Sequence, residues 1–372
     1  MTLSTAEAGV REAALEDGVV SAVLAGGRRV ELHQLALRDL CPCPECRHPV
    51  SGQRLFESAR VLSDTRANAV AVSDEGTLLL EWEDGHRSIF TPDVLAEVTH
   101  APPAAPKPVV WSAPLGGTPP RHDWEAVATD AFALRAWLRD AAALGFTLLS
   151  GVPVDPGSVA EVAQRFGAVR ETNYGRVFDV RVDVGATNLA DTALPLSPHT
   201  DNPYRRPTPT LQLLHCLASE VGGGETVLVD GFAVVERLRR DSPERLALLA
   251  RTSIRYAYRD ADAELATDVS VVTLDADGSP VALHLNNRSK GVPVGTPELV
   301  ADWYDAYLAL LALVDDPVQQ VAFRLEPGDL VLFDNERILH GRTGFSSAGA
   351  RHLQGCYADR DGLLSTLAVL ER

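Results

Sequence analysis

Residues 197–204, Ser-Pro-His-Thr-Asp-Asn-Pro-Tyr, contain the pattern His-x-Asp. On an extended strand, residues i and i+2 point to the same face, and we predict such a strand here. His199 and Asp201 can then offer an imidazole nitrogen and a carboxylate oxygen to one metal ion. Two ligands do not complete a metal site, so the function of the chain depends on whether a third ligand follows.

The candidate third ligand is His340, which Gly341 and Arg342 follow directly. Two histidines and one carboxylate leave three positions of an octahedron open, and non-haem Fe(II) uses this arrangement to hold a bidentate cosubstrate together with O₂. Arg351 follows eleven residues after His340. Its guanidinium can bind a carboxylate through two hydrogen bonds. These residues together predict an oxygenase.

The composition excludes several other classes of protein. With 45% hydrophobic and 23% charged residues, the 372-residue chain is globular and long enough for two domains. Its net charge of −17 argues against binding nucleic acid or an anionic membrane surface. No run approaches about 18 apolar residues, so we expect no membrane span. Residues 1–10 lack a basic segment followed by an apolar run, so we expect a cytoplasmic protein without a secretory signal peptide.

Three of the five cysteines, Cys41, Cys43 and Cys46, lie within six positions. They are too closely spaced for a disulfide framework, and in a chain without export signals they favour metal binding. His86 can supply a fourth ligand, and His48 is an alternative because it is near in sequence. A closed set of three cysteines and one histidine is typical of a structural zinc ion.

The chain divides into a small β-rich module of residues 1–100, a linker of residues 101–121 and a larger domain of residues 122–372. The linker contains seven prolines and no period. In the larger domain the apolar patterns predict helices at residues 123–144, 159–166, 231–239, 242–250 and 298–314. They predict strands at residues 146–152, 177–184, 198–204, 210–216, 226–229, 252–258, 270–274, 281–286, 321–325, 329–334 and 352–358. Many short strands with a few helices on one side indicate a β-sandwich or barrel with helical cover.

The sequence around these residues resembles the γ-butyrobetaine hydroxylase family, in the taurine dioxygenase superfamily of Fe(II)/2-oxoglutarate oxygenases. The matching blocks are residues 199–203 (HTDNP), 211–216 (LQLLHC), 229–232 (VDGF), 327–329 (PGD), 333–335 (FDN), 340–342 (HGR) and 351–359 (RHLQGCYAD). The resemblance extends over nearly the whole chain. It implies a mainly β fold with flanking helices: a double-stranded β-helix (jelly-roll) catalytic domain and a small β-rich N-terminal zinc-binding module. It also implies a homodimer.

The resemblance assigns roles to individual positions. His199, Asp201 and His340 match the iron ligands, and Arg351 matches the residue that binds 2-oxoglutarate. Three further residues match positions that line the cosubstrate: Thr226, Asn188 and Leu214. The family also supports Cys41, Cys43, Cys46 and His86 as the zinc ligands. The cofactors implied are Fe(II), 2-oxoglutarate as cosubstrate, a structural Zn(II), O₂, and ascorbate as reductant.

The substrate of the family carries a trimethylammonium group, which is held between aromatic rings because their faces attract a cation. Tyr174 and Tyr357 match positions of this cage. Phe178 and Asp191 stand where the animal enzymes have Trp and Tyr. Tyr204 is an additional aromatic residue.

The opposite end of the substrate requires a partner for an anion. Asn287 matches a polar contact of the family, and Arg288 is a cation that the animal enzymes lack. With Asn202, these residues could bind either a carboxylate or a phosphonate. The chain therefore also resembles the 2-(trimethylamino)ethylphosphonate dioxygenases.

The sequence thus predicts a 2-oxoglutarate-dependent dioxygenase that hydroxylates a small zwitterionic quaternary-ammonium compound similar to γ-butyrobetaine. The alternative on the same scaffold is a 2-(trimethylamino)ethylphosphonate hydroxylase. Two remoter alternatives are a protein that binds a betaine without turning it over and a catalytically inactive scaffold.

Overall fold

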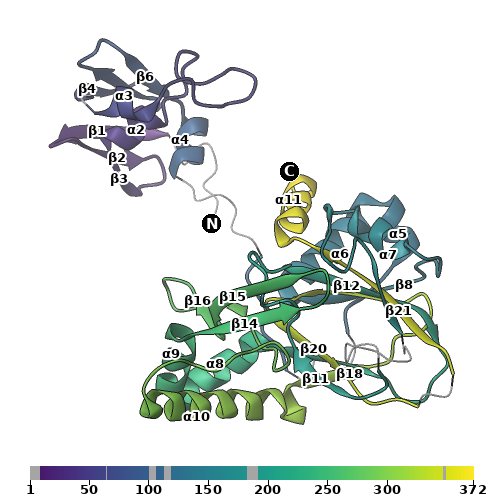
Figure 1. The fold of residues 1–372 in the computed structure, drawn as a ribbon. Coiled ribbons are helices and arrows are strands. Elements are labelled where there is room, and N and C mark those ends of the chain that lie inside the picture. The colour runs from purple at the N-terminus through teal and green to yellow at the C-terminus, as the bar shows by residue number, and fades with distance from the viewer. Residues whose placement is uncertain (1–8, 64, 100–105, 113–118, 182–191, 347–348) are drawn as a thin grey trace. The chain divides into compact units, whose positions relative to one another are not determined.

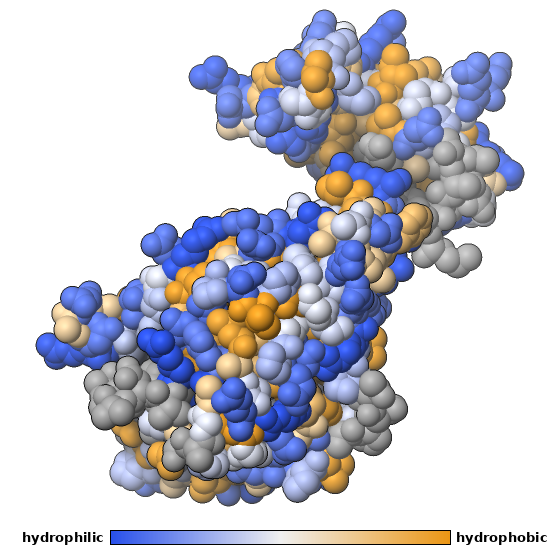
Figure 2. All heavy atoms as spheres, turned by 90° about the vertical axis from the view of Figure 1, so that its right-hand side faces the viewer, coloured by the Kyte–Doolittle hydropathy of each residue, from blue (hydrophilic) through white to orange (hydrophobic). Residues whose placement is uncertain are grey.

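A computed structural model describes residues 9–63, 65–99, 106–112, 119–181, 192–346 and 349–372. The chain forms two compact units, residues 1–104 and residues 105–372 (Figure 1). Figure 2 shows one face of the molecule, on which hydrophilic residues predominate and apolar residues form separate patches. Within the described residues, no helix has both the length and the apolar character that crossing a membrane requires.

The first unit consists of two three-stranded antiparallel sheets that share one core. One sheet has the order β1 (Val10–Glu16), β2 (Val19–Leu24), β3 (Arg29–His33), and the other the order β4 (Ala67–Val72), β5 (Leu78–Trp82), β6 (Arg87–Phe90). Its helices are α2 (Gln34–Asp39), α3 (Ser58–Leu62) and α4 (Pro92–Thr99). Val20 and Leu24 of one sheet pack with Leu78, Trp82 and Phe90 of the other, and all five are buried. Buried side chains alternate with more exposed ones along these strands, and the buried apolar side chains of both sheets therefore point into the shared core.

The second unit is built around two sheets. The seven-stranded sheet consists of β10 (Phe178–Arg181), β21 (Arg351–Ala358), β12 (Leu211–Ser219), β19 (Leu330–Asp334), β8 (Phe146–Ser150) and β7 (Arg121–Asp123), with β9 (Val169–Arg170) on β21. The four-stranded sheet consists of β11 (Leu196–His199), β20 (Ile338–Arg342), β13 (Thr226–Asp230) and β18 (Gln320–Phe323). Leu148, Val331 and Phe333 of the first sheet form one buried cluster with Leu228 and Ile338 of the second. The sheets therefore enclose a common interior, which is the predicted jelly-roll.

Helices cover the outer face of the seven-stranded sheet. They are α5 (Trp124–Thr129), α6 (Ala131–Leu144), α7 (Ser158–Ala163) and α11 (Arg360–Leu370). Leu211 and Leu213 of β12 pack against Trp137 of α6 and Leu363 of α11. Leu214 and Cys216, on the other face of the same strand, point into the interior cluster. The period of two residues along β12 thus separates the helical layer from the interior where the site lies.

A second layer covers the other side of the unit. It contains α8 (Gly231–Asp241), α9 (Pro243–Arg251), α10 (Pro297–Val314), and two hairpins, β14 (Ser253–Arg259) with β15 (Glu264–Ser270) and β16 (Val272–Leu274) with β17 (Pro280–Leu283). A 3₁₀ helix, η2 (Pro317–Gln319), precedes β18. Val235 of α8, Leu249 of α9, Trp303 of α10 and Tyr256 of β14 share one buried cluster.

Several predicted elements differ from the structure. The helix predicted at residues 123–144 is two helices, because Asp130 has extended backbone and its side chain caps α6 by accepting from Ala133 N. The strand predicted at residues 198–204 was wrong beyond His199, where β11 ends. Among the elements that the patterns did not predict are β1, β6, β15, α11 and β20, the strand that carries His340. In α11 the small and polar residues weaken the periodic signal.

A buried ion pair joins three distant segments of the second unit. The guanidinium of Arg337 donates to Asp230 Oδ2 at 2.8 Å and to Val109 O at 2.8 Å, and Asp230 Oδ2 also accepts from Trp111 N at 3.1 Å. The side chains of Arg337 and Asp230 are 2% and 0% exposed. Residues 109–111 lie inside the predicted linker, yet these bonds join them to the second unit.

Replacing Arg337 by Met should destabilise the second unit strongly. The change leaves the Asp230 carboxylate buried without its cation, which costs about 3–5 kcal/mol of the free energy of unfolding. The matched control is Arg139→Met, which removes an exposed pair with Glu371 and should cost at most about 1 kcal/mol. Urea unfolding of the full chain measures both effects, and equal losses in the two variants would contradict the assignment.

Candidate metal centres and active site

The His199, Asp201 and His340 side chains meet where two strands of the four-stranded sheet pair. In the register of β11 and β20, His199 lies opposite His340. Asp201 Oδ1 is 3.3 Å from His199 Nε2, and Asp201 Oδ2 is 3.6 Å from His340 Nε2. One ligand atom from each of the three lies within 4.8 Å of the others. The three residues therefore converge. Asp201 does so from outside a strand, because β11 ends at His199.

Hydrogen bonds from two sides hold the segment that follows His199. The Asn335 side chain accepts from Asp201 N at 2.7 Å and donates to Asp201 O at 2.9 Å. On the other side, Thr200 N donates to Leu285 O at 2.8 Å, and Asn286 Nδ2 donates to Thr200 O at 2.9 Å. These contacts take the place of a strand in fixing the Asp201 carboxylate.

The electrostatics of the three side chains suit a metal ligand set. His199 Nδ1 donates to Ser197 O at 2.9 Å, which leaves Nε2 with its lone pair toward Asp201. Burial, and then the neighbouring His199, lower the pKa of His340 to about 3, so its ring is neutral. Burial raises the pKa of Asp201, but His199 and His340 lower it by a larger amount. The pKa is therefore below its usual value, and the carboxylate is ionised. Two imidazoles and one carboxylate fit Fe(II) with open positions.

The predicted cosubstrate residues lie on neighbouring strands. Arg351 begins β21, and its guanidinium carbon is 5.0 Å from the centre of the Phe345 ring. A Cβ added at Gly224 would be 3.1 Å from Arg351 Nε, which places this side chain close to β13, where Thr226 is buried. Burial lowers the pKa of Arg351, and the charged neighbours that affect it within the described ranges include no carboxylate. Its guanidinium is therefore available to bind the carboxylate of a ligand.

The two remaining residues that were predicted to line the cosubstrate have different outcomes. Leu214 lies on β12 opposite Gly355 of β21 and packs against the interior cluster. Asn188, like the predicted substrate residue Asp191, lies outside the described residues.

Five aromatic rings form an arc beside the three candidate iron ligands. The contacts between ring centres are Tyr357 to Phe178 at 5.1 Å, Phe178 to Tyr174 at 6.3 Å, Tyr174 to Tyr258 at 5.8 Å and Tyr258 to Tyr204 at 5.1 Å. At one end the Tyr357 hydroxyl donates to Asp201 Oδ2 at 3.1 Å. At the other end the Tyr204 hydroxyl donates to Asn202 Oδ1 at 2.6 Å. The arc thus begins and ends on the segment that carries Asp201.

Hydroxyl contacts and a close backbone approach hold this arc. The hydroxyls of Tyr174 and Tyr204 are 2.8 Å apart. Burial raises the pKa of both phenols, and the nearby Asp201 charge raises both further, so both are neutral. The Phe178 ring lies against Gly355, where an added Cβ would come within 2.4 Å of it. Gly355 therefore permits the position of Phe178.

Tyr258 is the member of the arc that the sequence did not predict. The strand predicted at residues 252–258 contains Tyr256 and Tyr258, and the buried Tyr256 shows which face points inward. Because residues i and i+2 share a face, Tyr258 points the same way. The alternation was a usable signal, but nothing in the sequence placed this strand next to Tyr174 and Tyr204.

The three residues predicted to contact the anionic end of the substrate differ in burial and in hydrogen bonding. Asn202 is 3% exposed, with φ of 56°, and its Nδ2 has no hydrogen-bond partner among the described residues. Asn287 is exposed, and its Oδ1 accepts from the Tyr307 hydroxyl at 2.6 Å. Arg288 is also exposed, and its charge contributes to lowering the pKa of both Asp201 and His340. Arg288 therefore lies within electrostatic reach of the candidate iron ligands.

The first unit contains a second metal-ligand set. His86 Nε2 lies 3.3 Å from Cys41 Sγ and 3.7 Å from both Cys43 Sγ and Cys46 Sγ. Tetrahedral zinc with ordinary bond lengths requires sulfur–nitrogen separations of about 3.5 Å. The four side chains therefore fit zinc. His48, the alternative ligand, is not in this set, and its Nδ1 instead accepts from Ser51 N at 3.1 Å.

Arg38 is a neighbour of the candidate zinc ligands, and the sequence did not reveal it. It is 6% exposed and donates to Cys46 Sγ at 3.1 Å. Burial raises the pKa of the Cys46 thiol to about 12, although this hydrogen bond lowers it. A bound cation would offset this cost and hold the three thiolates together.

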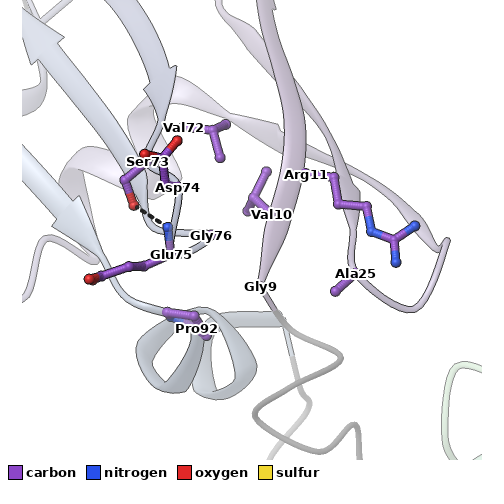
Figure 3. Close-up of a pocket in the computed structure, with 10 residues that line it drawn as sticks. All are labelled: Gly9, Val10, Arg11, Ala25, Val72, Ser73, Asp74, Glu75, Gly76 and Pro92. Atoms are coloured by element: carbon purple, nitrogen blue, oxygen red, sulfur yellow. Dashed lines mark hydrogen bonds between the residues drawn. The ribbon is translucent and has the colours of Figure 1, made fainter.

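The hollow in the first unit that Figure 3 shows is not a candidate site. It is lined by Gly9, Val10, Arg11, Ala25, Val72, Ser73, Asp74, Glu75, Gly76 and Pro92. None of these residues belongs to either metal-ligand set.

A jelly-roll that brings two histidines and one aspartate together defines the class of non-haem iron oxygenases. Comparisons with known proteins give the same class. Residues 110–357 match the family model "Taurine catabolism dioxygenase TauD, TfdA family", and residues 16–96 match "Gamma-butyrobetaine hydroxylase-like, N-terminal". The asparagine oxygenase solved with Fe(II), 3-hydroxyasparagine and succinate shares the fold, with a TM-score of 0.52 and 22% identity over 63% of this chain and 80% of that one.

Similar sequences identify the family. The chain is 37% identical over 361 residues to the gamma-butyrobetaine dioxygenase of Pseudomonas sp. (strain AK-1), covering 95% of this chain and 94% of that protein. It is 29% identical over 345 residues to the mitochondrial trimethyllysine dioxygenase of Rattus norvegicus, covering 90% and 81%. The chain belongs to the γ-butyrobetaine hydroxylase family of TauD/TfdA dioxygenases. It is an enzyme, a 2-oxoglutarate-dependent dioxygenase that uses Fe(II), and the non-catalytic alternatives are set aside.

Replacing Asn335 should weaken metal binding without removing any ligand. Asn335→Asp keeps the size of the side chain but turns an acceptor toward the carbonyls of Asp201 and Pro209. We expect the affinity for Fe(II), measured by anaerobic titration calorimetry, to fall about 10- to 100-fold. The circular dichroism spectrum should keep its native form. An unchanged affinity would show that the hydrogen bonds from Asn335 do not position Asp201.

The zinc site predicts different results for two histidine variants. Wild-type protein should contain about one zinc ion per chain by elemental analysis, because the four ligands fit a closed site. His86→Ala should lose most of this zinc, whereas the matched control His48→Ala should keep it. Less than about half a zinc ion per wild-type chain would count against the site.

Proposed function

We propose that the enzyme hydroxylates a small zwitterion that carries a quaternary ammonium at one end and an anion at the other, with γ-butyrobetaine as the first candidate. The observation that carries this proposal is the arc of aromatic rings that begins and ends beside Asp201. The names of the relatives, gamma-butyrobetaine dioxygenase and trimethyllysine dioxygenase, support a trimethylammonium group.

In this proposal His199, Asp201 and His340 hold Fe(II), and Arg351 binds the distal carboxylate of 2-oxoglutarate beside Thr226 and Leu214. Bound Fe(II) supplies, with 2-oxoglutarate and O₂, the oxidising power that replaces a C–H bond by C–OH. The protein supplies the position of the reacting carbon. The Tyr357 hydroxyl contributes by orienting the Asp201 carboxylate through its hydrogen bond.

The cation end of the substrate would contact Tyr174, Phe178, Tyr204 and Tyr357. Tyrosine and phenylalanine faces attract a quaternary ammonium, which cannot donate a hydrogen bond. The raised pKa values keep the phenols neutral, so the rings act through their faces and not as phenolates. The network of hydroxyl contacts keeps these faces in place before the substrate arrives.

The anion end would contact Arg288, Asn287 and Asn202. Within the described part of the chain, the buried Asn202 Nδ2 is a donor without a partner, and an acceptor on the substrate would remove the cost of leaving it unpaired. The positive charge of Arg288 favours a substrate that is purely anionic at this end. Trimethyllysine carries an ammonium group beside its carboxylate, so we expect it to be a poorer substrate than γ-butyrobetaine.

A phosphonate remains the second candidate for the anionic group. The specific observation in its favour is the pair of donors, Arg288 and the unpartnered Asn202 Nδ2, since a phosphonate offers three oxygen acceptors. We therefore include 2-(trimethylamino)ethylphosphonate as the alternative substrate.

The test compares γ-butyrobetaine, 2-(trimethylamino)ethylphosphonate and trimethyllysine with Fe(II), ascorbate and 2-oxoglutarate. Succinate formation should depend on the substrate, with kcat/KM highest for γ-butyrobetaine. Arg288→Gln should raise KM for the anionic substrates about 10- to 100-fold, because it removes a hydrogen bond between charged groups. The matched control Arg237→Gln, on the exposed face of α8, should leave KM unchanged. No substrate-dependent succinate with any of the three compounds would refute the proposal.

A further inference from the structure

The β14–β15 hairpin carries Tyr258 into the aromatic arc. The hairpin is fixed to the rest of the unit, because Ala257 N donates to Ser289 O at 2.9 Å and Gly291 N donates to Arg255 O at 2.6 Å. Tyr256, two residues earlier on the same face, is buried and donates its hydroxyl to His284 O. Tyr258 is therefore held by an anchored strand.

Tyr258 contacts two rings of the proposed cage. It stacks on Tyr204, with ring centres 5.1 Å apart and an angle of 22° between the rings. It meets Tyr174 edge to face, with a separation of 5.8 Å and an angle of 66°. Tyr258 therefore packs against both Tyr174 and Tyr204, whose hydroxyls are 2.8 Å apart, and extends the aromatic wall that they form.

The Tyr258 hydroxyl points to a carboxylate at the tip of the hairpin. It donates to Asp260 Oδ2 at 2.6 Å. The other oxygen of Asp260 accepts from Asp262 N at 2.8 Å and from Ala263 N at 2.6 Å, which fixes the carboxylate in the turn. Asp260 thus sets the angle of the Tyr258 ring and adds a negative charge next to it.

We propose that Tyr258, oriented by Asp260, is a specificity-determining residue that makes the site prefer a quaternary ammonium over a neutral group of the same shape. This inference rests on the proposed function, because it assigns a further wall to the same substrate site. Tyr258 is half-buried, so part of its surface remains available to a ligand. An aromatic face and a nearby carboxylate both add attraction for a cation that an uncharged alkyl group of the same shape does not receive. Simple core packing would favour neither form of the ligand.

The decisive experiment compares a trimethylammonium substrate with its neutral isostere, in which carbon replaces the quaternary nitrogen. We measure KM for both with Tyr258→Leu, Tyr258→Phe and wild type. Tyr258→Leu should lower the preference for the cation over the isostere about 3- to 30-fold, the range of a cation–π contact. Tyr258→Phe keeps the ring and should retain most of the preference. The KM for 2-oxoglutarate should not change.

The matched control is Arg255→Gln, which alters the exposed face of the same strand and should leave the preference unchanged. An equal loss of affinity for both ligands in Tyr258→Leu would overturn the inference, because it would show a packing role only.

Binding without turnover separates this inference from the proposed function. Tetramethylammonium is titrated into the anaerobic enzyme with Fe(II) and 2-oxoglutarate, and its affinity is measured by calorimetry. Weaker binding by Tyr258→Leu than by wild type supports the inference even if no zwitterion is hydroxylated, in which case the proposed function alone fails. Equal binding by the two proteins, or no binding by wild type, overturns the inference.

Discussion

The hydrogen bonds between the Asn335 side chain and the backbone of Asp201 are the constraint on which the site depends. Asn335 is fully buried in the connection between β19 and β20, and β20 carries His340. Its amide accepts from Asp201 N and donates to Asp201 O, so it holds one peptide segment from both sides. The strand β11 can therefore end at His199 while Asp201 still faces His340. One neutral side chain thereby aligns ligands that lie far apart in the chain.

The same segment connects the candidate iron ligands to the aromatic arc. Tyr357 donates to the Asp201 carboxylate, and Tyr204 donates to the side chain of Asn202. Asn202 has a positive φ, which asparagine tolerates better than most residues, and this turn directs the chain toward Tyr204. Residues that would contact the substrate are thus bonded to residues that would hold the metal. A shift of this segment would alter both the metal geometry and the aromatic wall.

The sequence predicted the chemistry of the site better than its geometry. His199, Asp201 and His340 could be found because iron restricts the types and spacing of its ligands, and the three close cysteines together with His86 could be found for the same reason. Asn335, Arg38 and Tyr258 were not found in these roles. Each acts through contacts with residues distant in sequence, and such contacts depend on how the sheets and hairpins pack. Many short strands predicted a β-sandwich or barrel, and the family resemblance specified the jelly-roll. The break at Asp130 and the early end of β11 could not be predicted, because they depend on single side-chain hydrogen bonds.

The most direct test of this account is a crystal structure of the full chain grown anaerobically with Fe(II) and 2-oxoglutarate, with anomalous scattering used to locate iron and zinc. The account predicts one iron ion bound by His199 Nε2, an Asp201 oxygen and His340 Nε2, with Asn335 bonded to both sides of the Asp201 peptide and 2-oxoglutarate paired with Arg351. It predicts zinc between Cys41, Cys43, Cys46 and His86. Iron bound without Asp201, or an Asn335 side chain turned away from it, would contradict the account.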